Sequence, residues 1–593
     1  MKSGNQGEVI YKEVIIIGNG PSGIALSFLL SGNIPYVISN SHPDEMLAAR
    51  LTPALGQCLL QQDLETLSSG LEGRTTNQIS LLMDALLHPG ADIGLEMEPL
   101  VEFRKTGNKI DHVVLGKGPP GGSWHRMDPQ ILTLSLASWM SLPGLPFHST
   151  DSREKRAYAC DVANYYVQYT EKMDLNKHFR NNVQVTSAEP VDCENKCHNL
   201  HSEKARTRKN NWVKKINKEI KESVEACIEP ESVENREEYR SCFISNAINC
   251  LMMRGRRKSR CKRSKEQMVD DNPMRVINLN RGQEKKRSIS FCCDSSNVCD
   301  RYDGKSFNDS INIYSLRNSC SLDYNSVPLS YNFPCCDSNS NWIVNASDGN
   351  TGEKITYSCK YLVLATGGND LPNRLDISKS KKDPSWLLYD SSSLEHNLNS
   401  YVTERKGGEV DPILIVGAGL SAADAVIAAR AKNVPVIHVF RNKSPDLNKQ
   451  LPENLYPEYH KVHQMMVNPD STYPLYTAYP EYNLTDLNDK SRTITLTSKE
   501  GKRVELNVSF AVVLVGSRPD LSFLPQNFKL AIRKNLPLDC KTNPVDINRL
   551  SHSVIGYDNL FVIGPLAGDN FVRFLPGGAL AVVSELYRRN NYS

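Results

Sequence analysis

Glycines near the N-terminus have the spacing of a turn that binds a dinucleotide. The hexapeptide GNGPSG begins at residue 18, directly after the β-branched run 14–17, and an apolar helical stretch follows it. Its first glycine allows a tight turn, its second lets a pyrophosphate approach the backbone, and its third lets helix and strand pack closely. The N-terminus of the helix attracts phosphate. A coincidental glycine-rich turn is the alternative. The residues predicted to bind the dinucleotide here are Gly18, Gly20, Pro21, Ser22 and Gly23.

A second glycine motif, GAGLSA, begins at residue 417, directly after the apolar run 413–416. Its context is the same, although alanine stands at the third position of the pattern. The next apolar run ends in Arg441 and Lys443, and a basic residue there suits the 2′-phosphate of NADP better than the ribose of NAD. A solvated loop is the alternative for these two cations. The residues predicted to bind this second dinucleotide are Gly417, Gly419, Ser421, Arg441 and Lys443.

Three further segments carry residues suited to the surroundings of a cofactor. Gly121 and Gly122 permit close backbone approach, and the flat face of Trp124 could support a flavin; a packed turn with a core tryptophan is the alternative. His125 is a weak candidate for catalysis, because a histidine beside a tryptophan more often packs or forms a hydrogen bond. The other two segments follow the apolar runs 361–365 and 560–563. The contacts predicted from them are Thr366, Gly367, Gly564 and Asp569.

The elements that would position these motifs alternate between strand and helix signals. Apolar runs at 14–17 and 36–38 enclose a helical pattern, and runs at 413–416 and 436–440 enclose another, so each motif lies in a predicted βαβ unit. Such units build parallel sheets with right-handed crossovers. The predicted fold class is therefore α/β, with two Rossmann-type dinucleotide-binding domains. Further buried strands are expected at 361–365, 511–515 and 560–563.

The composition divides the chain into a host and an inserted segment. Its 593 residues carry a net charge of +3, which gives no argument for a nucleic-acid binder, and no run of 18 apolar residues predicts a transmembrane helix. The N-terminal apolar run is broken by glycine and proline, so we expect an intracellular, cytoplasmic protein without a signal peptide. Twelve of the 16 cysteines fall in 191–336, where 27 Lys and Arg against 20 Asp and Glu give +7. We expect this segment to be mostly disordered.

The inserted segment has candidate sites of its own. Cys193, Cys197, His198 and His201 have the atoms for zinc, but the histidine spacing is short and no second half follows, so no metal site is predicted. The basic cluster Arg254–Arg263 suits nuclear import or nucleic acid, and a solvated charge run is the alternative. The cluster leaves a nuclear or organelle association open, and the segment could bind protein partners.

The motifs together resemble those of known flavoproteins. A GxGxxG turn, a GGSW loop, an ATG strand end and a GxGxxA turn are similar to the flavin-dependent monooxygenases with two dinucleotide-binding domains. The WHRM stretch with the apolar segment 131–145 also resembles the N-hydroxylating ornithine and lysine monooxygenases. A closer resemblance is to the oxidative stress-induced growth inhibitor family of animals. It is carried by GNGPSGIALSFLLSG (18–32), LEGR (71–74), LLMDALLHPGADIG (81–94), HVVLGKGPPGGSWH (112–125), DVANYY (161–166) and FVRFLPGGALA (571–581).

The resemblance implies FAD at the first glycine turn, NADPH at the second, and a monooxygenase or NADPH-oxidising activity. NADPH would reduce FAD by hydride transfer, and the reduced flavin would activate molecular oxygen toward an unknown small-molecule substrate. No CxxC pair supplies the dithiol of a disulfide reductase. The resemblance also implies a role in the oxidative-stress response and in the regulation of growth or cell death.

Three departures from the family patterns bear on catalysis. The monooxygenase fingerprint F-x-G-x-x-x-H is absent from 369–412, and the run 36–38 is not followed by the acidic residue that usually binds ribose. Asp569 follows the strand 560–564 only after five residues. A catalytically weak flavoprotein fold that regulates through protein partners is therefore the alternative function. The expected domains are an FAD-binding domain at 1–190, 337–400 and 536–593, an NADPH-binding domain at 401–535, and the insertion 191–336.

Overall fold

The computed structural model describes residues 9–148, 155–191, 342–375, 377, 383–405, 411–442, 452–468 and 474–590. Lys443, the basic cluster Arg254–Arg263 and nearly all of the predicted insertion lie outside these residues. The prediction of disorder there and the candidate zinc ligands also fall outside the described residues. Within the described residues the fold class is the predicted one, because two sheets with parallel cores each carry a glycine turn at the end of a central strand.

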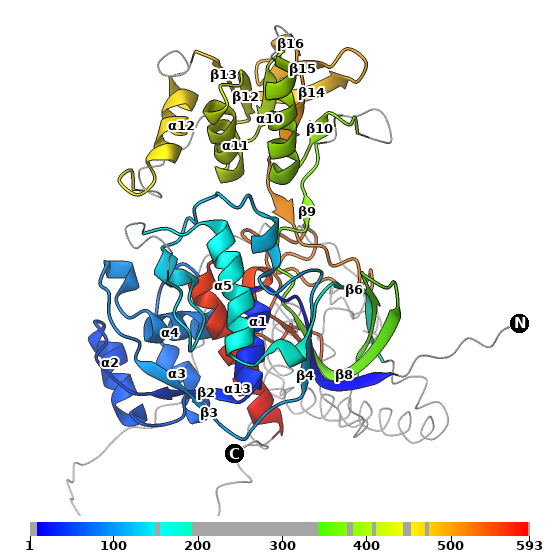
Figure 1. Ribbon diagram of the computed structural model, residues 1–593. Helices are drawn as coiled ribbons and strands as arrows, with labels where there is room; N and C mark the ends of the chain where they lie inside the picture. The colour runs from blue at the N-terminus through cyan, green and yellow to red at the C-terminus, as the bar shows by residue number, and fades with distance from the viewer. Residues whose placement is uncertain are drawn as a thin grey trace, which may run out of the picture. The chain divides into compact units, whose positions relative to one another are not determined.

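The first sheet has seven strands in the order β5-β4-β1-β8-β7-β6, and β19 pairs with β8. Strands β5, β4, β1, β8 and β19 run parallel to their neighbours, whereas β6 and β7 add an antiparallel hairpin edge. The glycine turn follows β1, which lies between β4 and β8 (Figure 1). Their bounds are β1 Ile10–Ile17, β4 His112–Leu115, β5 Phe179–Arg180, β6 Val183–Pro190, β7 Trp342–Asp348, β8 Lys354–Leu364 and β19 Leu560–Val562.

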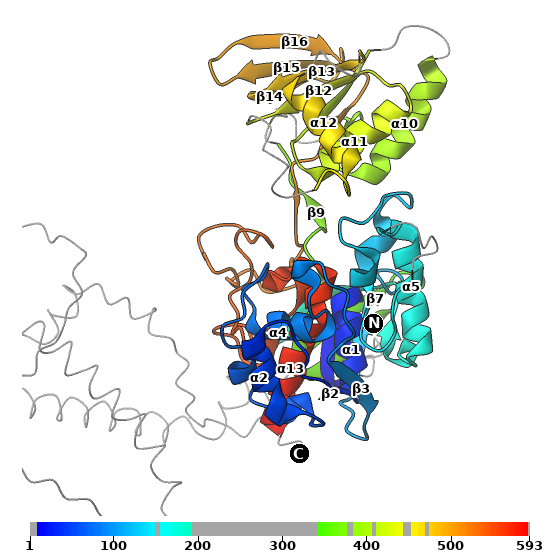
Figure 2. The same cartoon turned by 90° about the vertical axis from the view of Figure 1, so that its left-hand side faces the viewer.

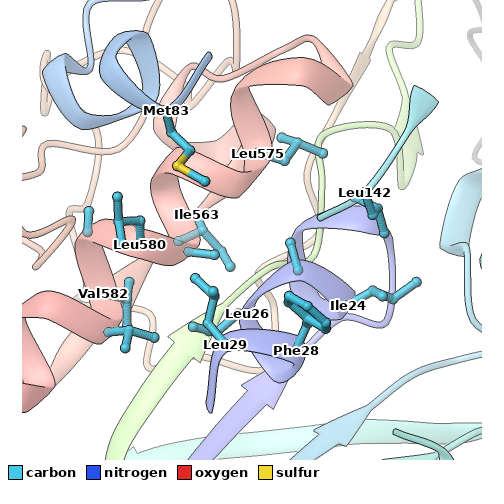
Figure 3. Close-up of a cluster of buried hydrophobic side chains, with 14 of the residues drawn as sticks. Ile24, Leu26, Phe28, Leu29, Met83, Leu142, Ile563, Leu575, Leu580 and Val582 are labelled. Atoms are coloured by element: carbon cyan, nitrogen blue, oxygen red, sulfur yellow. The ribbon is translucent and has the colours of Figure 1, made fainter. Parts of the chain in front are cut away.

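Helix α1 (Pro21–Leu30) is apolar on all sides because it is buried on all sides. It contacts α13 (Leu575–Asn590), which also contacts α4 (Gln78–Leu87). Figure 3 shows side chains of these three helices meeting in one cluster, among them Leu26, Met83 and Leu580. The core therefore joins the N-terminal and C-terminal ends of the chain, and it fixes α1 beside the strand that leads into the glycine turn.

The second sheet has the order β10-β17-β11-β12-β13, and all of its pairs are parallel. Figure 2 shows α10, α11 and α12 side by side at this sheet, with the antiparallel strands β14–β16 beside it. The bounds are β10 Leu387–Leu388, α10 Ser391–Arg405, β11 Ile413–Val416, α11 Leu420–Ala431, β12 Val436–Phe440, α12 Pro457–Val467, β13 Tyr476–Pro480, β14 Tyr482–Asn488, β15 Thr493–Ser498, β16 Arg503–Asn507 and β17 Ala511–Val513. The remaining helices and strands are β2 Asn33–Val37, α2 Glu45–Leu51, α3 Leu64–Ser68, β3 Val101–Lys105, α5 Ala159–Lys172, β9 Leu371–Pro372 and β18 Ser517–Arg518.

One strand pairing differs from the predicted βαβ unit. The run 36–38 overlaps β2, but β2 pairs antiparallel with β3 in a separate two-stranded sheet, and the neighbours of β1 are β4 and β8. Pro35 lies within β2 and has no backbone N–H, so the strand cannot donate a full ladder on both edges. The apolar pattern located this strand but did not reveal its partner.

Candidate functional site

The first glycine turn is closed by backbone contacts that exclude side chains. Gly18 has φ +115°, and a Cβ there would lie 2.2 Å from the carbonyl oxygen of Ala365, at the end of β8. A Cβ on Gly23 would lie 2.1 Å from the carbonyl oxygen of Gly18. Glycine is therefore required at both positions, by conformation and space at the first and by space at the second. The predicted strand–turn–helix context is confirmed, while the cofactor contacts themselves stay predictions.

Gly20 is different, because the space beside it is open. No described atom lies within 4 Å of the position that a Cβ would take at Gly20. Gly20 is the N-cap of α1, and no described side chain caps this helix end. The first-turn N–H groups of a helix have no partner within the helix and carry positive partial charge. An uncapped helix end beside an open glycine fits a pyrophosphate.

The paired-glycine loop lies against this turn. A Cβ on Gly122 would lie 3.1 Å from the Cα of Gly20, and the N–H of Gly121 donates to the carbonyl of Asn19 at 2.9 Å. The side chain of Asn19 in turn donates to the carbonyl of Gly118 at 2.6 Å and to Asn181 Oδ1 at 3.1 Å. The two motifs, far apart in sequence, are therefore in contact. Asn19 joins them, and its position between two glycines in the sequence did not indicate this role.

Trp124 and His125 lie in the short 3₁₀ helix Gly122–Arg126 that follows. Trp124 is half-buried and packs on the core, and its ring centroid lies 6.4 Å from that of Tyr166. Its predicted contact with a flavin stays a prediction. His125 is exposed, and its Nε2 lies 2.8 Å from the carbonyl oxygen of Pro120, to which it donates. This bond closes the loop. The catalytic role of His125 stays a prediction, with Nδ1 as the remaining ring nitrogen.

The end of β8 presents Thr366 and Gly367 next to the same turn. Thr366 Oγ1 is buried and has no hydrogen-bond partner among the described residues. A buried hydroxyl without a partner is costly, and a bound ligand would satisfy it. Gly564, after β19, has φ +72°, and a Cβ there would lie 2.3 Å from Ser22 Oγ. Four sequence segments therefore converge on the N-terminus of α1.

Asp569 is buried, and its carboxylate is hydrogen-bonded to three side chains. It is fully buried, and its carboxylate accepts hydrogen bonds from Thr75 Oγ1 at 2.7 Å, Asn77 Nδ2 at 2.9 Å and Ser80 Oγ at 2.8 Å. Burial raises the pKa of Asp569, whereas these donors and His552 lower it. The carboxylate joins the C-terminal loop to α4. Its predicted contact with a cofactor stays a prediction, and the three donors were not apparent from sequence, because isolated polar residues around a helix start are common.

The second glycine turn repeats the pattern of the first. Gly417 has φ +139°, and a Cβ there would lie 2.3 Å from the carbonyl oxygen of Leu514. Gly419 is the N-cap of α11, and no described atom lies within 4 Å of its Cβ position. Ser421 is exposed in the first turn, and Arg441 is exposed just after β12. These features fit a second pyrophosphate, and the Arg441 side chain is accessible to a ligand from solvent.

The described cysteines are all free, and two of them are buried. Cys58, Cys160, Cys359 and Cys540 are free thiols, and burial raises the pKa of both Cys359 and Cys540 to about 12. Over the described ranges, no group of three or more His, Cys, Asp or Glu side chains could hold a metal ion. No helix in the same ranges is long and apolar enough to cross a membrane.

These observations define an α/β protein with two dinucleotide-binding folds. Residues 350–547 match the family model described as pyridine nucleotide-disulphide oxidoreductase, which supports an oxidoreductase. The chain is 33% identical to oxidative stress-induced growth inhibitor 2 of Homo sapiens, over 97% of this chain and 93% of that protein. It is 32% identical to oxidative stress-induced growth inhibitor 1 of Homo sapiens, over 97% and 95%. The chain belongs to the oxidative stress-induced growth inhibitor family.

Two solved structures match the chain over most of its length with little identity in sequence. Bacillithiol disulfide reductase Bdr from Bacillus cereus is 11% identical, with a TM-score of 0.47, over 98% of this chain and 99% of that one. A flavin-containing monooxygenase from Stenotrophomonas maltophilia is 10% identical, with a TM-score of 0.43, over 98% and 99%.

Proposed function

We propose that the protein binds FAD at the first glycine turn and NADPH at the second, and couples NADPH oxidation to the activation of molecular oxygen. The carrying observation is that the middle glycine of each turn, Gly20 or Gly419, stands open at a helix N-terminus that no described side chain caps. In contrast, a Cβ on the first glycine of either turn, Gly18 or Gly417, would meet a backbone carbonyl. Open space at the middle glycine is what a pyrophosphate requires.

At the first turn, the residues of this chain would bind and orient the flavin nucleotide. The N–H groups at the start of α1 would hold the pyrophosphate, and the Thr366 hydroxyl would donate or accept the hydrogen bond that it lacks among the described residues. Gly121 and Gly122 would keep the paired-glycine loop close to the nucleotide. When bound, FAD supplies the ability to accept a hydride and to pass its electrons to oxygen.

At the second turn, α11 would hold the pyrophosphate of NADPH through its first N–H groups. Arg441 is exposed at the end of β12, where the adenosine ribose of a dinucleotide lies in this fold, and would pair with the 2′-phosphate. Lys443 is proposed for the same phosphate from sequence alone. A cation in this place favours NADPH over NADH.

Oxygen rather than a disulfide is proposed as the electron acceptor. A disulfide reductase needs a reactive thiolate pair, and the sequence has no CxxC spacing. Two of the four described cysteines are buried, with pKa values raised to about 12, so they are protonated at neutral pH. The unknown small-molecule substrate would compete with release of hydrogen peroxide. The names of the human relatives support a role in the oxidative-stress response and in restraining growth. A role in promoting cell death is proposed from the sequence resemblance alone.

The domain boundaries are part of the proposal. Residues 1–190, 337–400 and 536–593 would form the FAD-binding domain, and 401–535 would form the NADPH-binding domain. The segment 191–336 would serve protein partners from an intracellular location.

The test compares the purified protein with two matched variants, Gly20→Ala and Gly419→Ala. Both glycines have φ values that any residue adopts, −71° and −85°, and the added methyl meets no described residue, so it would interfere with a bound dinucleotide and not with the fold. The FAD extracted per chain should be at least tenfold lower in Gly20→Ala than in the wild type. Gly419→Ala should retain FAD but lose NADPH oxidation. Extracted FAD per chain and oxygen consumption with NADPH are measured. Wild-type protein that takes up no FAD, or variants that match it in both readouts, would contradict the proposal.

A further inference from the structure

A histidine lies directly beneath the second glycine turn. His438 is in the middle of β12, is fully buried, and pairs in register with Ile415 of β11. Its Nε2 lies 2.7 Å from the carbonyl oxygen of Gly417, and its Nδ1 lies 2.7 Å from the hydroxyl oxygen of Tyr476, the first residue of β13. His438 lies within the continuous apolar run 436–440, and this pattern alone does not single out the histidine.

The partners fix the proton on the ring. A carbonyl oxygen only accepts hydrogen bonds, so Nε2 of His438 carries the hydrogen and donates to Gly417. Burial lowers the pKa of His438 to about 4, so the ring is neutral at pH 7 and has one N–H. Nδ1 therefore accepts from the Tyr476 hydroxyl. Both ring nitrogens are occupied, and the chain of bonds runs from Tyr476 through His438 to Gly417.

The two turns differ at the place where this bond forms. In the first turn, glycine at position 23 lets the helix approach the Gly18 carbonyl, since a Cβ would lie only 2.1 Å from that oxygen. In the second turn Ala422 stands at the matching position, and its Cβ lies 3.4 Å from the Cβ position of Gly417. In this turn the His438 ring contacts the corresponding carbonyl, that of Gly417.

Holding this carbonyl also aims the next N–H group. A trans peptide is planar, so the Gly417 carbonyl and the Ala418 N–H point in opposite directions. The Gly417 N–H is itself held by the Val439 carbonyl at 2.9 Å. With His438 holding the carbonyl, the Ala418 N–H is fixed toward the opposite side of the peptide plane. Ala418 and Gly419 are both exposed.

We propose that His438 and Tyr476 are positioning residues for the second dinucleotide site. They set the orientation of the Gly417–Ala418 peptide that receives the pyrophosphate of NADPH. This inference rests on the proposed function, in which NADPH occupies this turn. Because a pyrophosphate is common to both nicotinamide dinucleotides, the pair acts on NADPH and NADH alike, whereas Arg441 distinguishes them.

The test measures dissociation constants for NADPH and NADH by titration of the purified full chain, together with FAD content and thermal unfolding. His438→Leu should weaken binding of both dinucleotides about tenfold, as expected for one lost buried hydrogen bond. His438→Gln retains a donor and an acceptor and should restore most of the affinity. Tyr476→Phe removes one oxygen atom and should weaken both about threefold. Tyr479→Phe, on the same strand, is the matched control and should change neither.

The outcomes separate the inference from the proposed function. Wild-type protein that binds neither dinucleotide would contradict both. If the wild-type protein, His438→Leu and Tyr476→Phe all bind NADPH with the same affinity, the inference is overturned and the proposed function is not. Losses that appear only with an equal loss of FAD content and thermal stability, without rescue by His438→Gln, would also overturn it, because they indicate a structural role.

Discussion

At the residue scale, the site is defined by which glycines are crowded and which are not. Gly18 and Gly417 have positive φ and abut a backbone carbonyl, whereas Gly20 and Gly419 have ordinary φ and open surroundings. The first pair is required for folding of the turn. Under the proposed function the second pair is required only for dinucleotide binding, so substitution separates stability from binding.

Gly18→Ala and Gly20→Ala are predicted to fail in different ways. Gly18→Ala should lower the free energy of unfolding by roughly 2–4 kcal/mol, because φ is positive and the methyl meets the Ala365 carbonyl oxygen at 2.2 Å. Gly20→Ala should change it by less than about 1 kcal/mol while FAD affinity falls. Urea denaturation of the FAD-free proteins measures the first effect. Equal stability of the two variants would show that the crowding at Gly18 is relieved at no cost.

Asp569→Ala is predicted to destabilise the protein by about 3 kcal/mol. The change leaves Thr75, Asn77 and Ser80 without their shared acceptor in a fully buried place. Asp558→Ala, at an exposed carboxylate nearby in sequence, is the control. Thermal unfolding of both variants is the measurement, and similar midpoints for the two would mean that the buried cluster contributes little.

At the element scale, β4 and α1 are joined by a buried histidine that titrates unlike a free one. His112 Nδ1 donates to the Ile110 carbonyl at 2.8 Å, and its Nε2 accepts from Ser27 Oγ of α1 at 2.8 Å. The His178 ring stacks on it at 4.0 Å. Burial, with smaller contributions from His178 and Lys12, lowers the pKa of His112 to about 3.

This histidine should make the protein less stable in mild acid. Between the unfolded value of 6.5 and the folded value of about 3, the unfolded chain binds a proton that the folded chain does not, so stability falls as pH falls. At pH 5 this amounts to ~2 kcal/mol relative to pH 7. The comparison is His112→Gln against wild type, by urea denaturation at both pH values. The other buried histidines remain in both proteins, so an identical loss of stability would exclude His112 as the source.

At the scale of the whole molecule, the sequence predicts local features such as the glycine turns, whereas the pairing of strands depends on tertiary structure. Glycine spacing located both turns, because the phosphate-binding turn is a local feature of about six residues. Strand pairing was not local: β1 lies between β4 and β8, and β2, with Pro35, pairs elsewhere. The apolar run 436–440 predicts a buried strand that includes His438, but an apolar pattern does not indicate which groups a buried ring bonds to.

The anaerobic reaction with NADPH tests the central claim most directly. The purified protein, saturated with FAD, is mixed with NADPH without oxygen, and the flavin absorbance is followed. We predict that the flavin band bleaches with NADPH, more slowly with NADH, and not in Gly419→Ala, and that it returns when oxygen is admitted. A flavin band that both dinucleotides leave unchanged would contradict the account and favour a flavoprotein fold that acts through binding alone.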